Sequence, residues 1–476
     1  MSTRKKIIIL GILTYLLYVV LVYSSFYYQI NATNSIIPWG YNKQIFFILI
    51  SIGLIVLYWL AYKSIKNTKE NIKKIVILFS ILFSITFIIA PPIGSADVYN
   101  YAYRARVKTV YEQNPYLVAT ENYPDDLFYN FSPKEWNFMT MQYGPLWASV
   151  SIGFSKIAGD NFFWNIFLYK LLALLSFFGS AYLINRILKI TNPGKSLQGA
   201  LLYLWNPLIL FETINNAHND ILMIFIVLLA VYLVLKKKYI PSLLVLLLSV
   251  LLKYITILLV PVFLYFILKN FQKKGDKMKL VLKAGCLAVI IIVLFYFPFW
   301  DGIRTFNGIF QQSQIFSFLN FSLLPGFVFG ISYVVGSNYS WSYDTLSMIS
   351  RNVGLVTFVL FYIYQHSKML ITRNIDLIFY VFLILLSYIL LAVTYLQPWY
   401  FIWLIPLAVL MDRKYFPHFI AISSVVGLIS YAFLVTSLVY MLTFIIVVFI
   451  AIISRKDLFS NFINAQPIDK HTQINK

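Results

Sequence analysis

The sequence predicts an all-α, polytopic membrane protein with about 12–14 transmembrane helices. Of its 476 residues, 60% are hydrophobic and only 12% are charged, against roughly 45–50% and about 25% in soluble globular domains. Apolar runs recur from one end of the chain to the other, and a bilayer core of about 30 Å needs roughly 20 such residues per helix. These observations exclude a soluble enzyme and favour a single membrane domain over residues 1–476.

Fourteen apolar segments are predicted to form helices. They are residues 6–30, 44–62, 75–92, 162–188, 197–213, 221–235, 241–252, 254–268, 280–299, 354–364, 377–396, 401–411, 419–434 and 440–453. Several are too short to cross a bilayer upright and are interpreted as half-helices, tilted helices or re-entrant pairs. The first follows Arg4, Lys5 and Lys6, as a signal peptide would, but its apolar run is too long and no small-residue cleavage site follows. We expect it to be a retained helix.

The net charge of +21 indicates orientation. In a soluble chain, 38 Lys and Arg against 17 Asp and Glu would suggest nucleic-acid binding. Here the charges lie between apolar segments. With the N-terminus in the cytoplasm, 28 of the basic residues fall on the inner side and 11 of the acidic residues on the outer side, as the positive-inside rule predicts. We therefore expect a cell-membrane protein with both termini in the cytoplasm and no nucleic-acid partner.

Two outer loops are long, residues 93–159 and 300–352, and residues 454–476 are expected to form a cytoplasmic tail. Loops longer than about 12–15 residues are usually functional or disordered, and the aromatic content of these two disfavours disorder. Both are expected to contain helices that lie along the membrane surface. Residues 143–158 are expected to form such a helix, because a helix that crossed the bilayer at this point would place every later loop on the opposite side of the membrane. The single cysteine, Cys286, excludes an intramolecular disulfide.

The first outer loop offers a candidate general base in Asp97, a few residues after the two prolines that should end the preceding helix. Partial desolvation at the membrane surface raises the pKa of a carboxylate, which suits a base that acts on a hydroxyl. The alternative is that Asp97 caps the helix that follows. On that helix, Asp97, Tyr101 and Arg104 share one face. Arg104 and Arg106 either anchor a phosphate or pair with a carboxylate.

Two further outer turns carry isolated polar groups. His218, Asn219 and Asp220 interrupt apolar surroundings, where ionisable residues are functional candidates; the alternative is that Asn219 or Asp220 caps a helix. One histidine with two oxygens lacks the spacing of a zinc site. Lys253 lies in the middle of an apolar stretch of about 30 residues that begins and ends inside. It should therefore lie at the outer tip of two short helices, where it either meets a lipid phosphate or snorkels.

Aromatic residues mark the last outer turn. Trp399, Tyr400 and Trp403 can stack on a sugar ring, but aromatic residues also gather at membrane interfaces without binding a ligand. The second long loop offers Asp301 and Arg304 with the same ambiguity.

Five short motifs follow one another in the chain. They are Asp97-Val98-Tyr99 with Tyr101 and Arg106, then Asn114-Pro115-Tyr116, Tyr143-Gly144-Pro145-Leu146, Trp205-Asn206-Pro207 with His218-Asn219-Asp220, and Gln397-Pro398-Trp399-Tyr400. In this order, over roughly residues 75–412, the chain resembles the C-type glycosyltransferase superfamily (GT-C). Within it, the chain is most similar to the bacterial polyprenol-phosphate-mannose-dependent mannosyltransferases.

The resemblance implies an inverting transfer of a hexose, with mannose favoured, from a polyprenyl-phosphate donor. The acceptor is a glycan, a lipid or another molecule outside the cytoplasmic membrane. Asp97 is implied as the base. The leaving phosphate needs cationic or hydrogen-bond stabilisation, for which Lys253, Arg106, Arg104 and His218 are the candidates. The residues expected to bind the acceptor or the sugar are Asp220, Asn219, Tyr101, Trp399 and Tyr400.

No cofactor is firmly implied, and a divalent metal is the alternative. Some branches of the superfamily bind a divalent metal at an acidic pair in the first loop, but Ala96 and Val98 flank Asp97 here, and the later Asp125-Asp126 pair is expected to be solvated. Two other functions suit such a protein, a lipid-linked glycan polymerase or ligase and a transporter. The former typically carries a basic outer loop late in the chain, and the latter has polar residues near the middle of several helices. An early acidic loop and polar groups at the outer ends favour transfer.

Overall fold

The structure is a computed structural model that describes residues 1–31, 41–313, 322–336, 339, 341–371, 376–411 and 415–431. Within these residues the chain forms helices joined by turns, with no β-strand. The predicted segment 440–453 and the predicted tail 454–476 lie outside them. The α-helices are α1 (Thr3–Asn31), α2 (Tyr41–Ile65), α3 (Lys73–Ile89), α4 (Asp97–Thr109), α5 (Pro145–Ala158), α6 (Phe162–Thr191), α7 (Ser196–Leu204), α8 (Pro207–Leu210), α9 (Asp220–Leu235), α10 (Tyr239–Leu252), α11 (Val260–Leu268), α12 (Lys274–Tyr296), α13 (Asn307–Ser313), α14 (Leu323–Gly336), α15 (Tyr343–Ile371), α16 (Leu377–Leu391), α17 (Phe401–Leu410) and α18 (Phe416–Ser430).

Short helical turns connect several of these helices. They are η1 (Thr120–Asn122), η2 (Lys134–Trp136), η3 (Pro193–Lys195), the π-helical turn η4 (Phe211–Asn215), η5 (Tyr254–Leu259), η6 (Phe297–Phe299), η7 (Arg304–Phe306) and η9 (Pro398–Tyr400).

The predicted class, an all-α polytopic membrane protein, is confirmed. In the described part of the chain, five helices are long and apolar enough to cross a bilayer, and the bent pair 207–235 makes a sixth if it counts as one span. Six further apolar helices have only 10–17 residues. Length alone therefore gives fewer full spans than the predicted 12–14, because many of the predicted segments are short helices.

Three elements differ from the prediction. The helix α14 was not among the fourteen predicted segments, because residues 300–352 were assigned to an outer loop with membrane-surface helices; its Pro325 lies in the first turn, where a missing N–H is tolerated. The helix α15 begins at Tyr343, inside the predicted second loop. The segment predicted at 197–213 is broken at Asn206-Pro207 into α7, α8 and η4.

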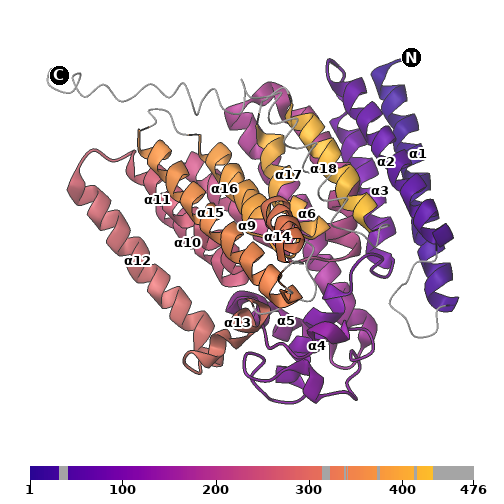
Figure 1. The fold of residues 1–476 in the computed structure, drawn as a ribbon. Coiled ribbons are helices and arrows are strands. Elements are labelled where there is room, and N and C mark those ends of the chain that lie inside the picture. Colours follow the sequence, from indigo (N-terminus) through magenta and orange to yellow (C-terminus); the bar gives the residue numbers. More distant parts are fainter. Residues whose placement is uncertain are drawn as a thin grey trace, which may run out of the picture.

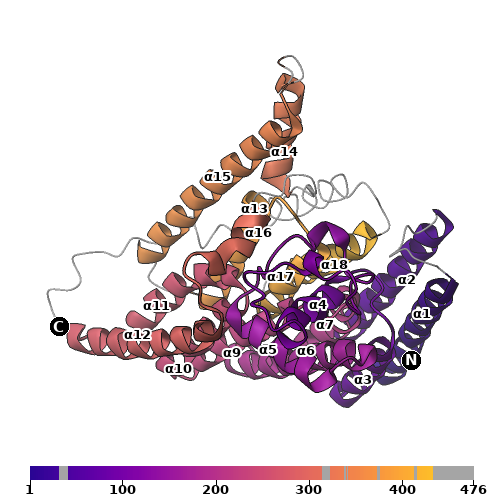
Figure 2. The same ribbon diagram turned by 90° about the horizontal axis from the view of Figure 1, so that it is seen from below.

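The helices form one bundle with the first loop at one end (Figure 1). The helices α1, α2 and α3 pack together along one edge, α12 lies along the opposite edge, and α4 and α5 pack on each other at the end of the bundle. Seen along that end, α14 and α15 pair and stand away from the rest (Figure 2). At the centre, α9 and α17 are apolar around their whole circumference, which is typical of fully enclosed helices.

A buried lysine holds the end of α3. The Lys170 ammonium, on α6, donates to the carbonyl oxygens of Phe87, at 2.9 Å, and Ala90. The last carbonyls of a helix have no partner within the helix, and a cation stabilises the negative end of the helix dipole. With its side chain 2% exposed, Lys170 therefore fixes the point where the chain leaves α3 towards Asp97.

A glycine lets the first loop approach α10. The Gly144 N–H donates to the Leu252 carbonyl at 3.1 Å, and a Cβ added at Gly144 would lie 2.0 Å from the Leu251 carbonyl oxygen. The start of α5 is therefore docked directly on the last turn of α10, and Lys253 is the next residue along the chain. The Tyr143-Gly144-Pro145 motif thus serves this close approach.

Gly144→Ala should lower the melting temperature of the purified protein. The new methyl group would overlap a backbone carbonyl, and overpacking of this kind costs about 1–3 kcal/mol. Gly153→Ala, on the same helix α5, is the matched control, because nothing lies within 4 Å of its added Cβ. That variant should melt at or above the wild-type temperature, since alanine is favoured over glycine in a helix by about 0.5–1 kcal/mol. Equal melting temperatures for the two variants would contradict the docking of Gly144 on α10.

Candidate active site

Two asparagines join the chain after α3 to the turn between η4 and α9. The Asn215 side chain accepts from the Ile93 N–H at 2.8 Å and donates to the Pro91 carbonyl at 2.9 Å. The Asn216 side chain accepts from the Gly94 N–H at 3.0 Å. Both asparagines are fully buried. Residues 91–94, which have no secondary structure of their own, thereby gain the partners that buried backbone groups need, and Asp97 is placed beside the turn.

Asp97 is the first residue of α4, and its side chain is 27% exposed. Its Oδ2 lies 3.4 Å from Nδ1 of His218 and 3.5 Å from the Tyr101 hydroxyl. No bond from a described residue reaches Oδ1. The alternative role as a helix cap does not occur, because Ala96 is the N-cap residue and no side-chain capping bond is formed.

The other side of His218 faces a carboxylate that was not among the predicted site residues. Nε2 of His218 lies 3.3 Å from Oε2 of Glu212, and both side chains are fully buried. The same oxygen accepts from the Asn216 amide at 3.1 Å and from the Tyr431 hydroxyl at 3.0 Å. The His218 ring stacks on Trp399 with a centroid distance of 4.1 Å. An imidazole flanked by two carboxylates can donate from both nitrogens only as the imidazolium.

The expected pKa shift of Asp97 is wrong in sign. Burial raises the pKa of this carboxyl, as predicted, but the contact with His218, the charge of Lys253 and the Tyr101 hydroxyl lower it. The net result is a pKa below the ordinary value of an aspartate. Asp97 is therefore ionised near pH 7. Burial raises the pKa of Tyr101 and of Tyr143, so both hydroxyls remain protonated.

Lys253 lies between the end of α10 and η5, as the apolar pattern predicted. Its ammonium contacts Oδ1 of Asp220 at 2.6 Å, and its side chain is 18% exposed. The same Asp220 oxygen accepts from the Trp403 indole N–H. The rings of Tyr400 and Trp403 lie 5.6 and 5.4 Å from the ammonium, within the range of a cation–π interaction. One contact with Asp220 leaves two N–H donors of the ammonium for a ligand.

Asp97 and Lys253 line one cavity of about 530 Å³. One end is apolar and lies against α15, where Ile257, Leu355 and Val359 both line the cavity and belong to the exposed apolar surface. The other end lies against the first loop and α13. The polar and aromatic residues that line this end and the centre are Asn100, Tyr101, Trp136, Gln142, Tyr143, Gln312, Tyr395, Trp399, Tyr400 and Trp403.

Arg104 does not line this cavity. Its guanidinium donates to the Asn100 side chain and to the carbonyl oxygens of Met139, Thr140 and Trp136, the last two at 2.6 and 3.0 Å. The side chain is 2% exposed. Burial lowers the pKa of Arg104 to about 10, which leaves it charged at pH 7. Its donors are used to join α4 to residues 136–140, so the structure gives no support to the predicted contact with a phosphate.

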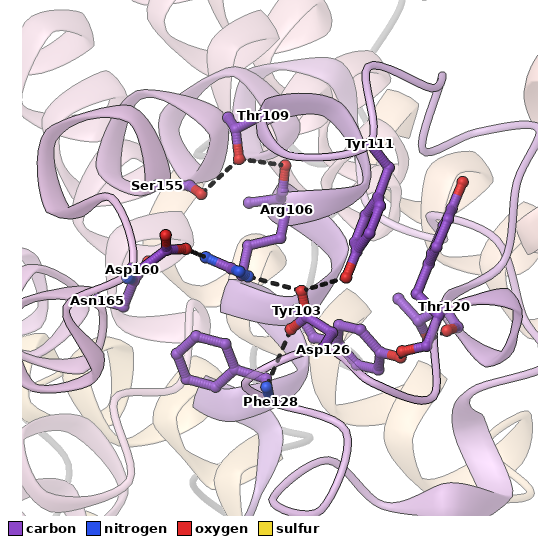
Figure 3. Close-up of polar contacts among 12 residues, drawn as sticks. Tyr103, Arg106, Thr109, Tyr111, Thr120, Asp126, Phe128, Ser155, Asp160 and Asn165 are labelled. Atoms are coloured by element: carbon purple, nitrogen blue, oxygen red, sulfur yellow. Dashed lines mark hydrogen bonds and ion pairs between the residues drawn. The ribbon is translucent and has the colours of Figure 1, made fainter.

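Arg106 does not line this cavity either, and its guanidinium lies among polar residues of the first loop (Figure 3). It contacts Asp126 at 2.7 Å and Asp160 at 2.8 Å. Asp126 also accepts from the Tyr111 hydroxyl at 2.9 Å and the Phe128 N–H at 2.9 Å. The expectation that the Asp125-Asp126 pair is solvated is wrong for Asp126, whose side chain is fully buried. The alternative of a pair with a carboxylate therefore describes Arg106.

The remaining predicted residues fall into three groups. Tyr101, Trp399 and Tyr400 line the cavity. His218, Asn219 and Asp220 lie behind its wall, each at most 2% exposed, and Asn219 forms no side-chain cap on α9. In the second loop, Asp301 and Arg304 form a partly exposed pair at 2.6 Å. No group of three or more His, Cys, Asp or Glu side chains in the described ranges could hold a metal ion.

Glu212, whose carboxylate contacts His218, was not among the site residues predicted from the sequence. The signal was present in the sequence, because Glu212 is a lone carboxylate inside the run 205–214, which is otherwise almost entirely apolar. Ionisable residues at such depth are functional candidates. The π-helical turn that aims Glu212 at His218 has no comparable sequence signal.

The fold and the cluster together define an integral membrane protein with paired acidic and basic groups beside a cavity at one end of its bundle. Residues 10–269 match the model of the family described as alpha-(1->6)-mannopyranosyltransferase, N-terminal domain. Since this match covers more than half of the 476 residues, the chain belongs to that family. The resemblance inferred from the motifs is thus confirmed. The match includes Asp97, Glu212, His218 and Lys253.

Two curated relatives are similar to part of the chain. "Alpha-(1->6)-mannopyranosyltransferase A" of Corynebacterium glutamicum is 27% identical over 158 residues, which are 33% of this chain and 31% of that protein. "Probable alpha-(1->6)-mannopyranosyltransferase" of Mycolicibacterium smegmatis is 28% identical over 141 residues, 29% of this chain and 24% of that protein. The chain therefore spans less than a third of the length of the curated relatives that it matches.

Arg106→Gln should lower the melting temperature, because it strands the buried Asp126 carboxylate, and removal of one partner of a buried pair costs about 3–5 kcal/mol. Adding Asp126→Asn should restore part of the loss, since the stranded charge is then gone. Thermal unfolding of the two single variants and the double variant gives the coupling energy. Additive losses would contradict the pairing shown in Figure 3.

Proposed function

We propose that the protein is an inverting mannosyltransferase. It moves a hexose, with mannose favoured, from a polyprenyl-phosphate donor to a glycan, lipid or other acceptor on the outer side of the cytoplasmic membrane. The observation that carries the proposal is the cavity that joins an ionised, partly exposed Asp97 and a cationic Lys253 to an opening on the apolar surface. Family membership and the printed names of the two relatives support mannose as the sugar.

The apolar end of the cavity suits the donor's lipid chain. Ile257, Leu355 and Val359 line this end and are 58%, 49% and 44% exposed, and in a membrane protein such side chains face lipid. A polyprenyl chain can therefore enter from the bilayer while its phosphate reaches the centre. There, Lys253 offers a cation held in place by Asp220 and three aromatic rings.

The polar end of the cavity suits the acceptor. Asn100, Trp136, Gln142 and Gln312 line this end, and amide groups with an aromatic ring are the means by which proteins bind sugar hydroxyls and ring faces. Asp97 lines the same cavity, so an acceptor bound there can reach the base.

In the reaction, the acceptor hydroxyl attacks C1 of the sugar from the face opposite the phosphate. Its proton passes to Oδ1 of Asp97, the new C1–O bond forms, and the old C1–O bond breaks with its electron pair going to the phosphate. The products are the inverted glycoside, the polyprenyl phosphate and protonated Asp97, which loses its proton to water. Lys253 stabilises the charge that develops on the phosphate, the usual role of a fixed cation beside a leaving group.

The location of the polar groups supports transfer over transport. Asp97 begins α4, and α4 and α5 lie at the end of the bundle (Figure 1). An enzyme that takes its donor from the membrane and its acceptor from outside needs its cavity at such an end. The distribution of basic residues along the chain favours the outer side for this end.

Asp97→Asn should abolish transfer from polyprenyl-phosphate mannose. The amide keeps the shape of the side chain but cannot take the acceptor's proton, and loss of a general base lowers kcat by about 10²–10⁴-fold. The test incubates the purified full chain with a panel of polyprenyl-phosphate hexoses and glycan acceptors and identifies products by mass spectrometry. Asp125→Asn, an exposed carboxylate of the same loop, is the control and should keep wild-type turnover. Near-normal transfer by Asp97→Asn would exclude the base role.

Lys253→Met should raise the donor KM by about 10–100-fold, because a hydrogen bond to a charged group contributes about 1.5–3 kcal/mol. The variant also strands Asp220, so the double variant Lys253→Met, Asp220→Asn separates the two effects. If Lys253 binds the phosphate, the double variant keeps the raised KM. If the double variant instead has the wild-type donor KM, Lys253 does not bind the phosphate and only neutralises the charge of Asp220.

A further inference from the structure

Glu212 is the only fully buried carboxylate of the described residues that reaches Asp97 through a second ionisable side chain. The chain of contacts runs from Oε2 of Glu212 to Nε2 of His218 at 3.3 Å and from Nδ1 of His218 to Oδ2 of Asp97 at 3.4 Å. Glu212 lines no part of the cavity, so it touches neither substrate. Its position therefore calls for an explanation other than ligand binding.

Burial of this carboxylate is costly unless a charge pairs with it. An isolated buried carboxylate would take up a proton, and a pair with a cation prevents that. Oε1 of Glu212 has no partner among the described groups, and the two other donors to Oε2, from Asn216 and Tyr431, are neutral. Among the described residues, the side chain in contact with Glu212 that can carry a positive charge is His218.

The same imidazole acts on Asp97 at its second nitrogen. It lies 3.4 Å from Oδ2 of Asp97, which lines the cavity, and no bond from a described residue reaches Oδ1. A neutral His218 has one N–H and could serve only one of the two carboxylates. Two carboxylates with a neutral ring between them would compete for a proton.

We infer that Glu212 is a positioning residue that keeps His218 protonated, and that His218 in turn holds Asp97 ionised with Oδ1 aimed at the acceptor hydroxyl. The inference rests on the proposed function and adds to it the reason why Asp97 can act as a base over a wide pH range. Glu212 acts through His218, and it never contacts the reacting atoms.

Other ionisable groups face Asp97 and stay the same in the variants below. They are Tyr101 and Arg104 on α4, Tyr143 just before α5 and Lys253 just after α10, with Asp220 at the start of α9 in contact with Lys253. A change in pH dependence on substitution of Glu212 can therefore be assigned to the Glu212 charge.

Glu212→Gln is the test, because glutamine keeps an oxygen that accepts from Asn216 and Tyr431 and removes only the charge. With the wild-type full chain in lipid nanodiscs, kcat/KM should be flat on the acid side down to about pH 5, since Asp97 is ionised there. In Glu212→Gln, His218 keeps only Asp97 as a counter-charge and holds its proton less firmly. Asp97 then loses part of the positive charge that keeps it ionised, and the acid limb should move up towards neutral pH. We expect kcat at pH 7 to fall by roughly 10–100-fold, which is less than the loss expected when the general base itself is removed. The KM values for donor and acceptor should stay within about twofold of wild type.

Two further variants complete the design. Glu212→Asp keeps the charge and should restore the wild-type acid limb with partial turnover, which a purely structural role would not predict. Glu135→Gln removes an exposed carboxylate from η2 and should leave the pH profile unchanged. An unchanged acid limb with kcat within about twofold of wild type in Glu212→Gln would overturn the inference. If Glu212→Gln fails to fold, His218→Gln must give the same shift of the acid limb.

A second readout separates this inference from the proposed function. In protein labelled with ¹³C-histidine, the His218 signal, assigned by its loss in His218→Gln, should have the imidazolium shift at pH 7 in the wild type and the neutral shift in Glu212→Gln. This measurement needs no turnover. Wild-type protein without transfer activity contradicts the proposed function alone, whereas a neutral His218 in the wild type overturns the role of Glu212 alone.

Discussion

The attachment of residues 91–97 to the turn between η4 and α9 is the interaction on which the rest of the site depends. Two consecutive asparagines supply the partners that this irregular segment lacks, and Lys170 satisfies the end of the helix before it. Irregular backbone at the end of a membrane bundle is stable only when such partners are present. Once this segment is held, Asp97 is beside His218, and each buried charge of the cluster has an opposite charge in contact.

Much of the fold was predictable because apolar runs and basic loops have a direct physical meaning in a bilayer. The class, the order of most helices, the helix at residues 145–158 and the tip position of Lys253 followed from hydropathy and charge. The number of full spans did not, because a short apolar run is equally consistent with a crossing and with a half-helix. The helix α14 was not separated from the second outer loop, in which only membrane-surface helices were predicted.

The site was predictable only where a residue was both polar and isolated in apolar sequence. That rule singled out His218, Asp220 and Lys253, and Asp97 was singled out by its position after Pro91 and Pro92; the fold brings the four close together. The rule failed for Arg104 and Arg106, which join parts of the first loop to each other. In a polar loop, the sequence does not distinguish a charged side chain that binds a ligand from one that makes such internal contacts. The direction of the Asp97 pKa shift also depended on His218, which is more than a hundred residues away in the chain. A local sequence pattern does not reveal a contact at that separation.

Exposed apolar side chains of η5 and α15 line part of the cavity, and in the proposed function they decide how the lipid-borne donor is supplied. A polyprenyl chain that entered from the bilayer would not pass through water, so the cost of about 0.8 kcal/mol per CH₂ for its extraction would not oppose binding. Occupancy then depends on the mole fraction of the carrier in the membrane and on lateral diffusion in two dimensions. A cavity of about 530 Å³ has room only for the units of the proposed donor next to its phosphate, so the length of the tail beyond them should not affect binding.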